Sequence, residues 1–345
     1  MTAPLSPAGA PPAPRGGPVL EVEGLHVTFA TPDGAVQAVR GVDYSVGEGE
    51  VLGIVGESGS GKSVSVLAVM GLLPRGAKVT GSIRYRGQEL VGLSEEEMRH
   101  LRGGRIAMIF QDPMTSLNPV LNVGYQIAEA VEVHKPGIRR DDATTRAVEL
   151  LGAVGIPNPR QRAKQYPHEF SGGMRQRAMI AMAIANDPDV LIADEPTTAL
   201  DVTIQAQILD VLETVQEATS SAIILITHDL GMVAGMADRI TVMYAGRVAE
   251  TGSVFDVFGR PRHPYTLGLL ESLPRLDESG LEQLVPIAGS PPSLLRPPPA
   301  CAFHPRCRFA QPVCRAETPP LRPIQGTAQR SACHFAEDLD GTGAR

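Results

Sequence analysis

The sequence GESGSGKS, from Gly56 to Ser63, determines the fold that we expect for this chain. It follows a short apolar run, VLGIV, that predicts a buried strand over Val51 to Val55. It precedes VSVLAVMGLL, which predicts a helix over Val64 to Leu73 that ends before Pro74. A loop of the pattern G-x-x-x-x-G-K-S between a strand and a helix is typical of a polyphosphate site, whereas a glycine-rich surface turn requires neither element.

The residue types of this loop suit the binding of a nucleotide. Its backbone N–H groups and the partial positive charge of the helix N-terminus attract phosphates. The glycines let the backbone turn tightly and approach the phosphates, Lys62 reaches the β- and γ-phosphates, and the Ser63 hydroxyl holds Mg²⁺. The predicted nucleotide-binding residues of the loop are Gly56, Ser58, Gly59, Ser60, Gly61, Lys62 and Ser63.

Length and charge limit the kinds of protein that this chain can be. Its 345 residues favour two domains, or one domain with an extension, and its net charge of -7 argues against nucleic acid as a partner. No apolar run approaches the roughly 18 residues that span a bilayer. Residues 1–17 are rich in Pro, Ala and Gly and lack the features of a secretory signal, so we expect a disordered tail. The chain is therefore predicted to be cytosolic, and a partner would have to dock it to a membrane.

The N-terminal part of the chain predicts an antiparallel β subdomain. Residues 20–29 and 35–46 alternate apolar and polar side chains around a turn at 31–34, as antiparallel strands do. A helix is predicted to begin after Ser94, because Glu97 stands three residues later and completes a capping box.

The central part of the chain predicts a mostly parallel sheet with a helical insertion. A buried strand is expected over residues 105–112, and residues 113–170 are mostly helical, with an amphipathic helix near 139–155. Three further short runs are continuously apolar, as strands buried on both faces are, and helical segments separate them. These runs are 189–194, 222–227 and 239–244.

Two adjacent acids stand at the end of the first of these runs, in VLIADEP. Asp194 is placed to orient Mg²⁺, and Glu195 is placed to polarise the water that attacks the γ-phosphate. The carboxyl ends of strands are where such α/β folds bind their ligands. The alternative is that the two acids cap the next helix.

A second anion-binding edge is predicted in FSGGMRQR, where Ser171, Gly172 and Gly173 open a long helix. One chain does not need two phosphate cradles for one nucleotide, so the second cradle would serve the ATP of another subunit. The alternative is a simple N-cap. His228 ends a later strand in THD and would contact the γ-phosphate, or it is a structural histidine.

The order of these motifs resembles the ATP-binding subunit of ABC transporters over residues 18–260. The resemblance implies the ABC cassette fold of P-loop NTPases: a parallel-sheet core, an antiparallel β subdomain and a helical subdomain. It also implies ATP and Mg²⁺ as cofactors, with Glu195, His228 and Gln111 as catalytic residues. One departure from the family pattern is Met174, where many members have Gln, although the Ser and both Gly of the signature are intact.

The resemblance also implies a role for each motif residue. The implied roles are adenine stacking for Phe29, the Walker A loop for Gly56 to Ser63, the Q-loop contact to Mg²⁺ and to the transmembrane partner for Gln111, the signature for Ser171 to Met174, Mg²⁺ binding in Walker B for Asp194, the catalytic carboxylate for Glu195, the D-loop for Asp201, and the switch histidine for His228.

The C-terminal part resembles the extension of dipeptide and oligopeptide importer ATPases. This second resemblance covers His263 to Pro274, Ile287 to Leu295 and Cys301 to Cys314. It implies an ATPase that powers peptide import at the cytoplasmic face of the cell membrane. The implied partners are a paralogous ATPase in a heterodimer, two transmembrane permease subunits and an extracytoplasmic peptide-binding protein. The expected domains are an ABC nucleotide-binding domain over 18–262 with the insertion at about 113–170, an extension over 263–337 and a disordered tail over 338–345.

The sequence is also compatible with other functions. One alternative is an importer of nickel or another small solute in place of peptides. Another is a soluble ABC ATPase that acts on nucleic acid or ribosomes. Such soluble ATPases tend to have two cassettes or a long coiled-coil insertion, and neither is visible here. A non-catalytic, metal-bearing regulatory protein is disfavoured, because Lys62, Asp194, Glu195 and His228 are all intact.

All four cysteines lie in the extension, where they predict a metal site. Stable disulfides are disfavoured in the cytosol, and four thiolates are the ligands of a 4Fe–4S cluster. His304 and His334 make a Cys₃His zinc site the alternative, and free thiols are a third possibility. The resemblance to the importer branch favours the iron–sulfur cluster in a structural role. Its expected ligands are Cys301, Cys307, Cys314 and Cys333.

Overall fold

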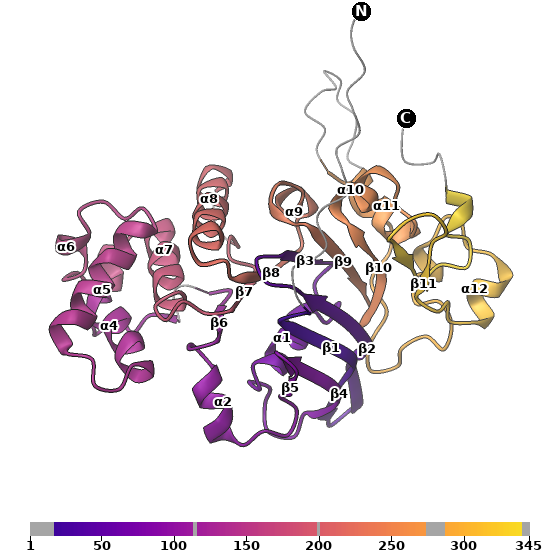
Figure 1. Ribbon diagram of the computed structural model, residues 1–345. Helices are drawn as coiled ribbons and strands as arrows, with labels where there is room; N and C mark the ends of the chain where they lie inside the picture. Colours follow the sequence, from indigo (N-terminus) through magenta and orange to yellow (C-terminus); the bar gives the residue numbers. More distant parts are fainter. Residues whose placement is uncertain (1–16, 113–115, 199–200, 274–286, 340–345) are drawn as a thin grey trace, which may run out of the picture.

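The computed structural model describes residues 17–112, 116–198, 201–273 and 287–339 (Figure 1). Residues 1–16 and 340–345, which include most of the two predicted disordered tails, lie outside this description. The C-terminal tail was predicted to begin too early. Glu337–Leu339 forms a short 3-10 helix, η3, and Leu339 is buried. The packed part of the chain therefore continues beyond the predicted boundary at residue 337.

The centre of the molecule is an eight-stranded sheet with the order β11-β12-β10-β9-β3-β8-β7-β6. Its five parallel strands confirm the predicted parallel core. Every residue of β3, β7 and β8 is buried, which explains why these segments are continuously apolar. The parallel strands are β3 (Val51–Val55), β6 (Ile106–Ile109), β7 (Val190–Asp194), β8 (Ala222–Thr227) and β9 (Arg239–Tyr244).

The antiparallel edge of this sheet was not predicted. The strand β10 (Arg247–Ser253) pairs with β9, and the extension supplies β12 (Arg330–Ser331) and β11 (Arg322–Pro323). The extension therefore continues the central sheet itself.

A second, four-stranded sheet confirms the predicted antiparallel β subdomain. Its order is β2-β1-β4-β5, and β1 pairs with β2 along most of its length. Buried residues of this sheet share a core with Leu52 and Ile54 of β3, so the subdomain packs on one face of the parallel sheet. The strands are β1 (Leu20–Thr31), β2 (Gly34–Val46), β4 (Lys78–Tyr85) and β5 (Gln88–Glu89).

Helices form a separate lobe beside the end of the parallel sheet that β6 forms (Figure 1). The helix expected near 139–155 is present as α5. Ser94 and Glu97 form the predicted capping box of α2, which precedes β6. The helices of this lobe are α4 (Val123–His134), α5 (Arg140–Ala153), α6 (Pro159–Arg162) and α7 (Gly172–Ala183), with the 3-10 helix η1 (Pro167–Glu169) before α7. The helix α2 (Glu95–Leu101) lies outside the lobe (Figure 1), and its Met98 belongs to the core of the antiparallel sheet.

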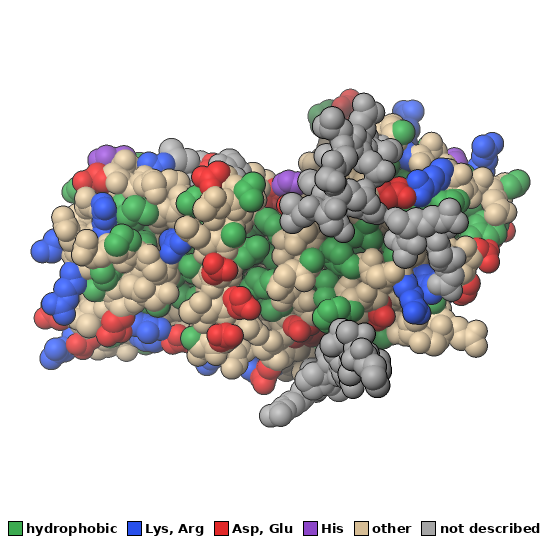
Figure 2. Space-filling model, turned by 90° about the horizontal axis from the view of Figure 1, so that it is seen from above, with side chains coloured by type: hydrophobic (Ala, Val, Ile, Leu, Met, Phe, Trp, Pro, Cys, Tyr) green, Lys and Arg blue, Asp and Glu red, His purple; other side chains and the backbone are tan. Residues whose placement is uncertain are grey.

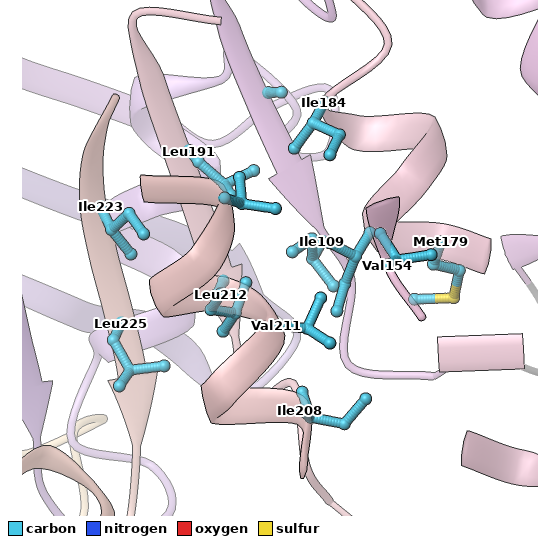
Figure 3. Packing of buried hydrophobic residues seen from close by; sticks show 14 of the residues in the cluster. Ile109, Val154, Met179, Ile184, Leu191, Ile208, Val211, Leu212, Ile223 and Leu225 are labelled. Carbon is cyan, nitrogen blue, oxygen red and sulfur yellow. The ribbon is translucent and has the colours of Figure 1, made fainter. Parts of the chain in front are cut away.

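The helix α8 (Val202–Thr219) covers the parallel sheet (Figure 3). Its buried residues Ile208, Val211 and Leu212 lie on one face of the helix. They belong to the same buried core as Leu191 of β7 and Ile223 of β8, part of which Figure 3 shows. Burying each such side chain contributes roughly 1.5–3 kcal/mol. The helix thereby fixes the end of β7, where the acid pair stands.

The extension packs tightly on the β9 side of the sheet. The rings of Tyr244, Tyr265 and Phe303 lie with centroids 4.6, 5.2 and 5.4 Å apart. Tyr244 ends β9 and the other two rings belong to the extension, so one core joins both parts. The other helices within the described residues are α1 (Lys62–Val69), α9 (Leu230–Met236), α10 (Val254–Gly259), α11 (Pro264–Glu271) and α12 (Pro312–Ala316), with the 3-10 helix η2 (His304–Arg306).

Candidate functional site

The loop between β3 and α1 has room only for glycine at two positions. A Cβ at Gly56 would lie 2.2 Å from the carbonyl oxygen of Met243. Gly61 has a φ of +100°, and a Cβ there would lie 2.5 Å from the carbonyl oxygen of Ala38 in β2. The loop is thus packed between the parallel sheet and the antiparallel subdomain. The following helix begins at Lys62 and ends at Val69, earlier than predicted, because the chain turns at Gly71 with a φ of +60°.

Lys62 folds back over the loop. Its Nζ donates hydrogen bonds to the carbonyl oxygens of Gly56 at 2.6 Å and Glu57 at 3.1 Å. The side chain is buried, and this burial lowers the pKa of Lys62, while the charges of Glu195, Asp194 and Glu57 act in the opposite direction. An ammonium group in such a setting gains an opposite charge when a phosphate enters the loop.

Ser63 and Asp194 meet where Mg²⁺ binding was predicted. The Ser63 hydroxyl donates a hydrogen bond of 2.9 Å to Oδ1 of Asp194. Burial raises the pKa of Asp194, and this hydrogen bond partly offsets the effect. A hydroxyl and a carboxylate side by side are oxygen ligands of the kind that Mg²⁺ prefers. The pair therefore fits the ion.

Glu195 is the centre of a cluster of polar side chains. Its Oε2 accepts hydrogen bonds from Nε2 of Gln111 at 2.8 Å and from the Thr198 hydroxyl at 2.9 Å. Its Oε1 lies 3.6 Å from Nδ1 of His228. The residue has a φ of +46°, a strained conformation for a side chain with a Cβ, which the backbone hydrogen bond from Glu195 to Ile226 helps to hold.

The structure thus brings together the three predicted catalytic residues, Gln111, Glu195 and His228. It adds Thr198, which was not predicted. The signal was present, because Thr198 follows Glu195 by three residues and ends the same turn. Gln111 contacts Glu195, and its contact with Mg²⁺ stays a prediction.

The second predicted anion-binding edge lies in the helical lobe, away from the phosphate loop of its own chain (Figure 1). Ser171 caps α7, and its Oγ accepts a hydrogen bond of 3.3 Å from the N–H of Met174. Gly173 lies against α8, where an added Cβ would be 2.9 Å from Ile204. Asp201 caps α8 and accepts a hydrogen bond of 3.0 Å from the N–H of Ile204. Ser171 and Gly172 are exposed.

Phe29 lies on β1, half-buried against the core of the antiparallel subdomain. The neighbouring strand β2 carries Ala38, whose carbonyl oxygen limits the space at Gly61. The hairpin of β1 and β2 therefore borders the phosphate loop. The stacking of Phe29 on adenine stays a prediction.

The four cysteines are free thiols that line one cavity of about 20 Å³, together with His304 and His334. Burial raises the pKa of Cys301 and of Cys307, and it raises the pKa of Cys333 to about 12. Among the described residues, no group of three or more His, Cys, Asp or Glu side chains is arranged to hold a metal ion.

Comparisons with known proteins agree with this geometry. The family model "ABC transporter" matches residues 39–198, and the model "Oligopeptide/dipeptide transporter, C-terminal region" matches residues 249–314. The "Oligopeptide transport ATP-binding protein OppD" of Salmonella typhimurium is 52% identical over 321 residues, which cover 93% of this chain and 95% of that protein. The "Dipeptide transport ATP-binding protein DppD" of Bacillus subtilis is 57% identical over 298 residues, 86% of this chain and 88% of that one.

Some relatives are much longer than this chain. The "Oligopeptide transport ATP-binding protein OppD" of Mycobacterium tuberculosis is 54% identical over 327 residues, which cover 95% of this chain but 53% of that protein. The chain thus spans about half the length of this relative. A solved dimer of the ATP-binding cassette MJ0796, in a post-hydrolysis state with ADP and Pi, matches with a TM-score of 0.62 and 26% identity, over 68% of this chain and 98% of that one.

The fold and the site together define a P-loop nucleotide-binding protein. The chain belongs to the family of ABC transporter ATP-binding proteins, in its oligopeptide/dipeptide branch. None of the helices in the described ranges combines the length and apolar composition that a bilayer span requires.

Proposed function

We propose that this chain is the ATP-hydrolysing subunit of an importer of dipeptides or oligopeptides. The observation that carries the proposal is the arrangement of Ser63, Asp194 and Glu195 beside a phosphate loop whose lysine is already in place. The relatives named as oligopeptide and dipeptide transport proteins supply the class of cargo. Nickel or another small solute stays the alternative cargo, because this chain contributes the site for ATP.

The polar cluster supports a mechanism for hydrolysis. Lys62 and the loop amides bind the β- and γ-phosphates, and Ser63 and Asp194 would hold Mg²⁺, which neutralises phosphate charge. Because Oε2 of Glu195 is engaged by Gln111 and Thr198, we assign Oε1 to polarising the attacking water. His228, whose side chain is 63% exposed, faces this oxygen and would contact the γ-phosphate.

The exposed Ser171 and Gly172 support the prediction of a two-subunit site. In this arrangement, two nucleotide-binding subunits face each other head to tail, and the phosphate loop of one meets the signature of the other. ATP would favour the closed pair because it binds that state better than the open one. The MJ0796 cassette, which this chain resembles, is dimeric. We favour a paralogous ATPase as the partner.

A cavity of about 750 Å³ between β6, α4 and α7 supports the docking of permease subunits. Its lining includes Phe110, Leu72 and Val133, which are 42%, 40% and 61% exposed. Exposed apolar side chains that line a concave surface are typical of a protein-binding site. Phe110 directly precedes Gln111, so a docked subunit would be linked to the catalytic cluster. We propose two permease subunits, an extracytoplasmic peptide-binding protein and a place at the cytoplasmic face of the membrane.

The rival function, an ATPase acting on nucleic acid or ribosomes, has less support. The net charge is -7, and on the face that Figure 2 shows the described Lys and Arg side chains are interspersed with Asp and Glu. A continuous basic stripe is the usual electrostatic footprint of such partners.

The test is to purify the tagged chain from native membranes in mild detergent and to identify the proteins that accompany it. Two multi-span subunits and a related ATPase would support the importer, and the associated binding protein would then be screened with peptides and with nickel. Recovery of the chain with ribosomes or DNA would overturn the transport function and leave ATP hydrolysis standing.

We also propose a structural 4Fe–4S cluster on Cys301, Cys307, Cys314 and Cys333. Its support is that all four thiols line one cavity, which matches the ligands in type and number, although the described side chains are not arranged around a metal site. The chain should be purified anaerobically after expression with iron, and its iron, sulfide, zinc and free thiols should be counted. A Cys314→Ser variant should lose the visible absorption of the cluster and the bound iron. Zinc with no sulfide, or four titratable thiols, would contradict the cluster.

A further inference from the structure

An acidic residue lies within the phosphate loop, and the C-terminal extension neutralises it. Glu57 follows the first glycine of GESGSGKS. Its carboxylate forms two hydrogen-bonded contacts with the guanidinium group of Arg306, at 2.6 Å from Nη1 to Oε2 and at 2.9 Å from Nη2 to Oε1. The Arg306 side chain is only 4% exposed, and the Glu57 side chain is 28% exposed. Such bidentate pairs are among the strongest charge-assisted contacts in proteins.

The backbone of Glu57 is held by a second residue of the extension. Its N–H donates a hydrogen bond of 2.8 Å to the hydroxyl oxygen of Tyr265 on α11, a residue that is fully buried. The carbonyl of Glu57 in turn accepts the hydrogen bond from Lys62. Glu57 therefore links two residues of the extension with the lysine that binds phosphate.

Arg306 is itself fixed in place by the extension. Its Nε donates to the carbonyl oxygen of Ala288 at 3.0 Å, and its Nη2 donates to that of Ile287 at 3.2 Å. Its guanidinium carbon lies 5.8 and 5.9 Å from the ring centroids of Tyr244 and Phe303. These contacts fix the guanidinium group of Arg306 in one position. Through its pair with Glu57, Arg306 can therefore also fix the position of the phosphate loop.

We propose that Arg306 and Tyr265 are positioning residues of the ATP site, and that the extension holds the phosphate loop in its nucleotide-binding shape through Glu57. This inference rests on the proposed ATP site and assigns part of it to the extension. The electrostatic reason is direct. A carboxylate beside a polyphosphate repels it, and Arg306 removes that repulsion. If Arg306 loses its charge, Glu57 stays in a poorly solvated position without a partner, which destabilises the loop.

The test measures ATP binding and turnover by the full-length chain, with a fluorescent ATP analogue and with a titration of ATP. Arg306→Gln should raise Kd and KM for ATP about tenfold, while kcat at saturating ATP changes less than threefold. The matched control is Arg308→Gln, because Arg308 pairs with Glu271 at 2.5 and 2.9 Å in the same segment without contacting the loop. This control should bind ATP like the wild type.

A second substitution distinguishes the effect of the unpaired charge from a general loss of structure. In the Arg306→Gln background, Glu57→Gln removes the unpaired carboxylate and should restore most of the ATP affinity, which a merely structural role would not predict. If Arg306→Gln does not fold, Tyr265→Phe takes its place. This variant removes the hydroxyl that accepts the hydrogen bond from the Glu57 N–H, and it should weaken ATP binding at least threefold while its melting temperature shows that it is folded.

The outcomes are distinct. Unchanged ATP affinity in the folded Arg306 and Tyr265 variants, or no recovery in the double variant, would overturn the inference and leave the proposed function intact. A wild-type chain that does not bind ATP better than Lys62→Ala would overturn the proposed function together with this inference.

Discussion

The hydroxyl of Ser63 donates a hydrogen bond of 2.9 Å to Oδ1 of Asp194, although 131 positions separate the two residues in the chain. Ser63 is the second residue of α1, and Asp194 is the last residue of β7. The contact joins the phosphate loop to the acid pair, so that one Mg²⁺ ion would reach both. Everything that we propose for catalysis depends on this junction and on its neighbour Glu195.

Glu195→Gln should keep ATP binding and lower turnover by at least a hundredfold. The amide keeps the shape of the side chain and its contact with Gln111, but it cannot accept a proton from water. Steady-state phosphate release and ATP binding measure the two effects. Glu213→Gln, on the exposed side of α8, is the matched control and should behave like the wild type. Normal hydrolysis by the Glu195 variant would show that another group is the base.

Lys62→Ala should weaken ATP binding itself. The ammonium already lies 2.6 Å from the Gly56 carbonyl oxygen, and its removal takes away the fixed positive charge that faces the β- and γ-phosphates. A nucleotide titration, with AMP as the ligand that lacks those phosphates, measures the loss. The affinity for ATP should fall more than tenfold and that for AMP should barely change. Equal affinity for ATP in variant and wild type is incompatible with the phosphate-loop function.

Substitutions at Ser171 distinguish a signature from a simple helix cap. Both Asp and Asn replace the hydroxyl that accepts from Met174, so both keep α7 capped. Only Asp places a negative charge where the partner's γ-phosphate would bind. Ser171→Asp should therefore abolish turnover in the assembled transporter, while Ser171→Asn keeps a substantial part of it. Equal activity of the two variants would favour the cap alone. Melting temperatures serve as the control for folding.

Glu250 should make stability depend on pH. It is fully buried in β10, and burial raises its pKa to about 7 from 4.5. Between these two values the folded chain keeps a proton that the unfolded chain releases, so stability falls as pH rises. The Glu250→Gln variant cannot ionise at this position, so it does not lose stability in this way. The difference in free energy of unfolding between this variant and the wild type should therefore shift in favour of the variant by about 3 kcal/mol from pH 4.5 to pH 8.

Urea titrations at several pH values measure this difference, and other titrating groups cancel because they are common to both proteins. Glu217→Gln, an exposed position on α8, is the control and should show no such change with pH. A constant difference between Glu250→Gln and the wild type would mean that Glu250 ionises as readily in the folded chain as in the unfolded one.

Local features of the sequence determined most of the helices and strands and most residues of the candidate ATP site. The glycine pattern of the loop, the capping box at Ser94 and the continuously apolar strands depend on residues close together in the chain, and the structure contains them. The role of Thr198 was missed, although its place three residues after Glu195, in the same turn, indicated it.

Only the tertiary structure decided how the extension relates to the ATP site. The strand β12 joins β10 through two residue pairs, and a segment this short has no periodicity to reveal it. Arg306 and Glu57 are 249 positions apart, so no local pattern connects them. Sequence by itself determined the chemistry of the phosphate loop, because spacing along the chain places those groups. The support from Arg306 and Tyr265 arises from packing, which brings distant side chains together only when the whole core has formed.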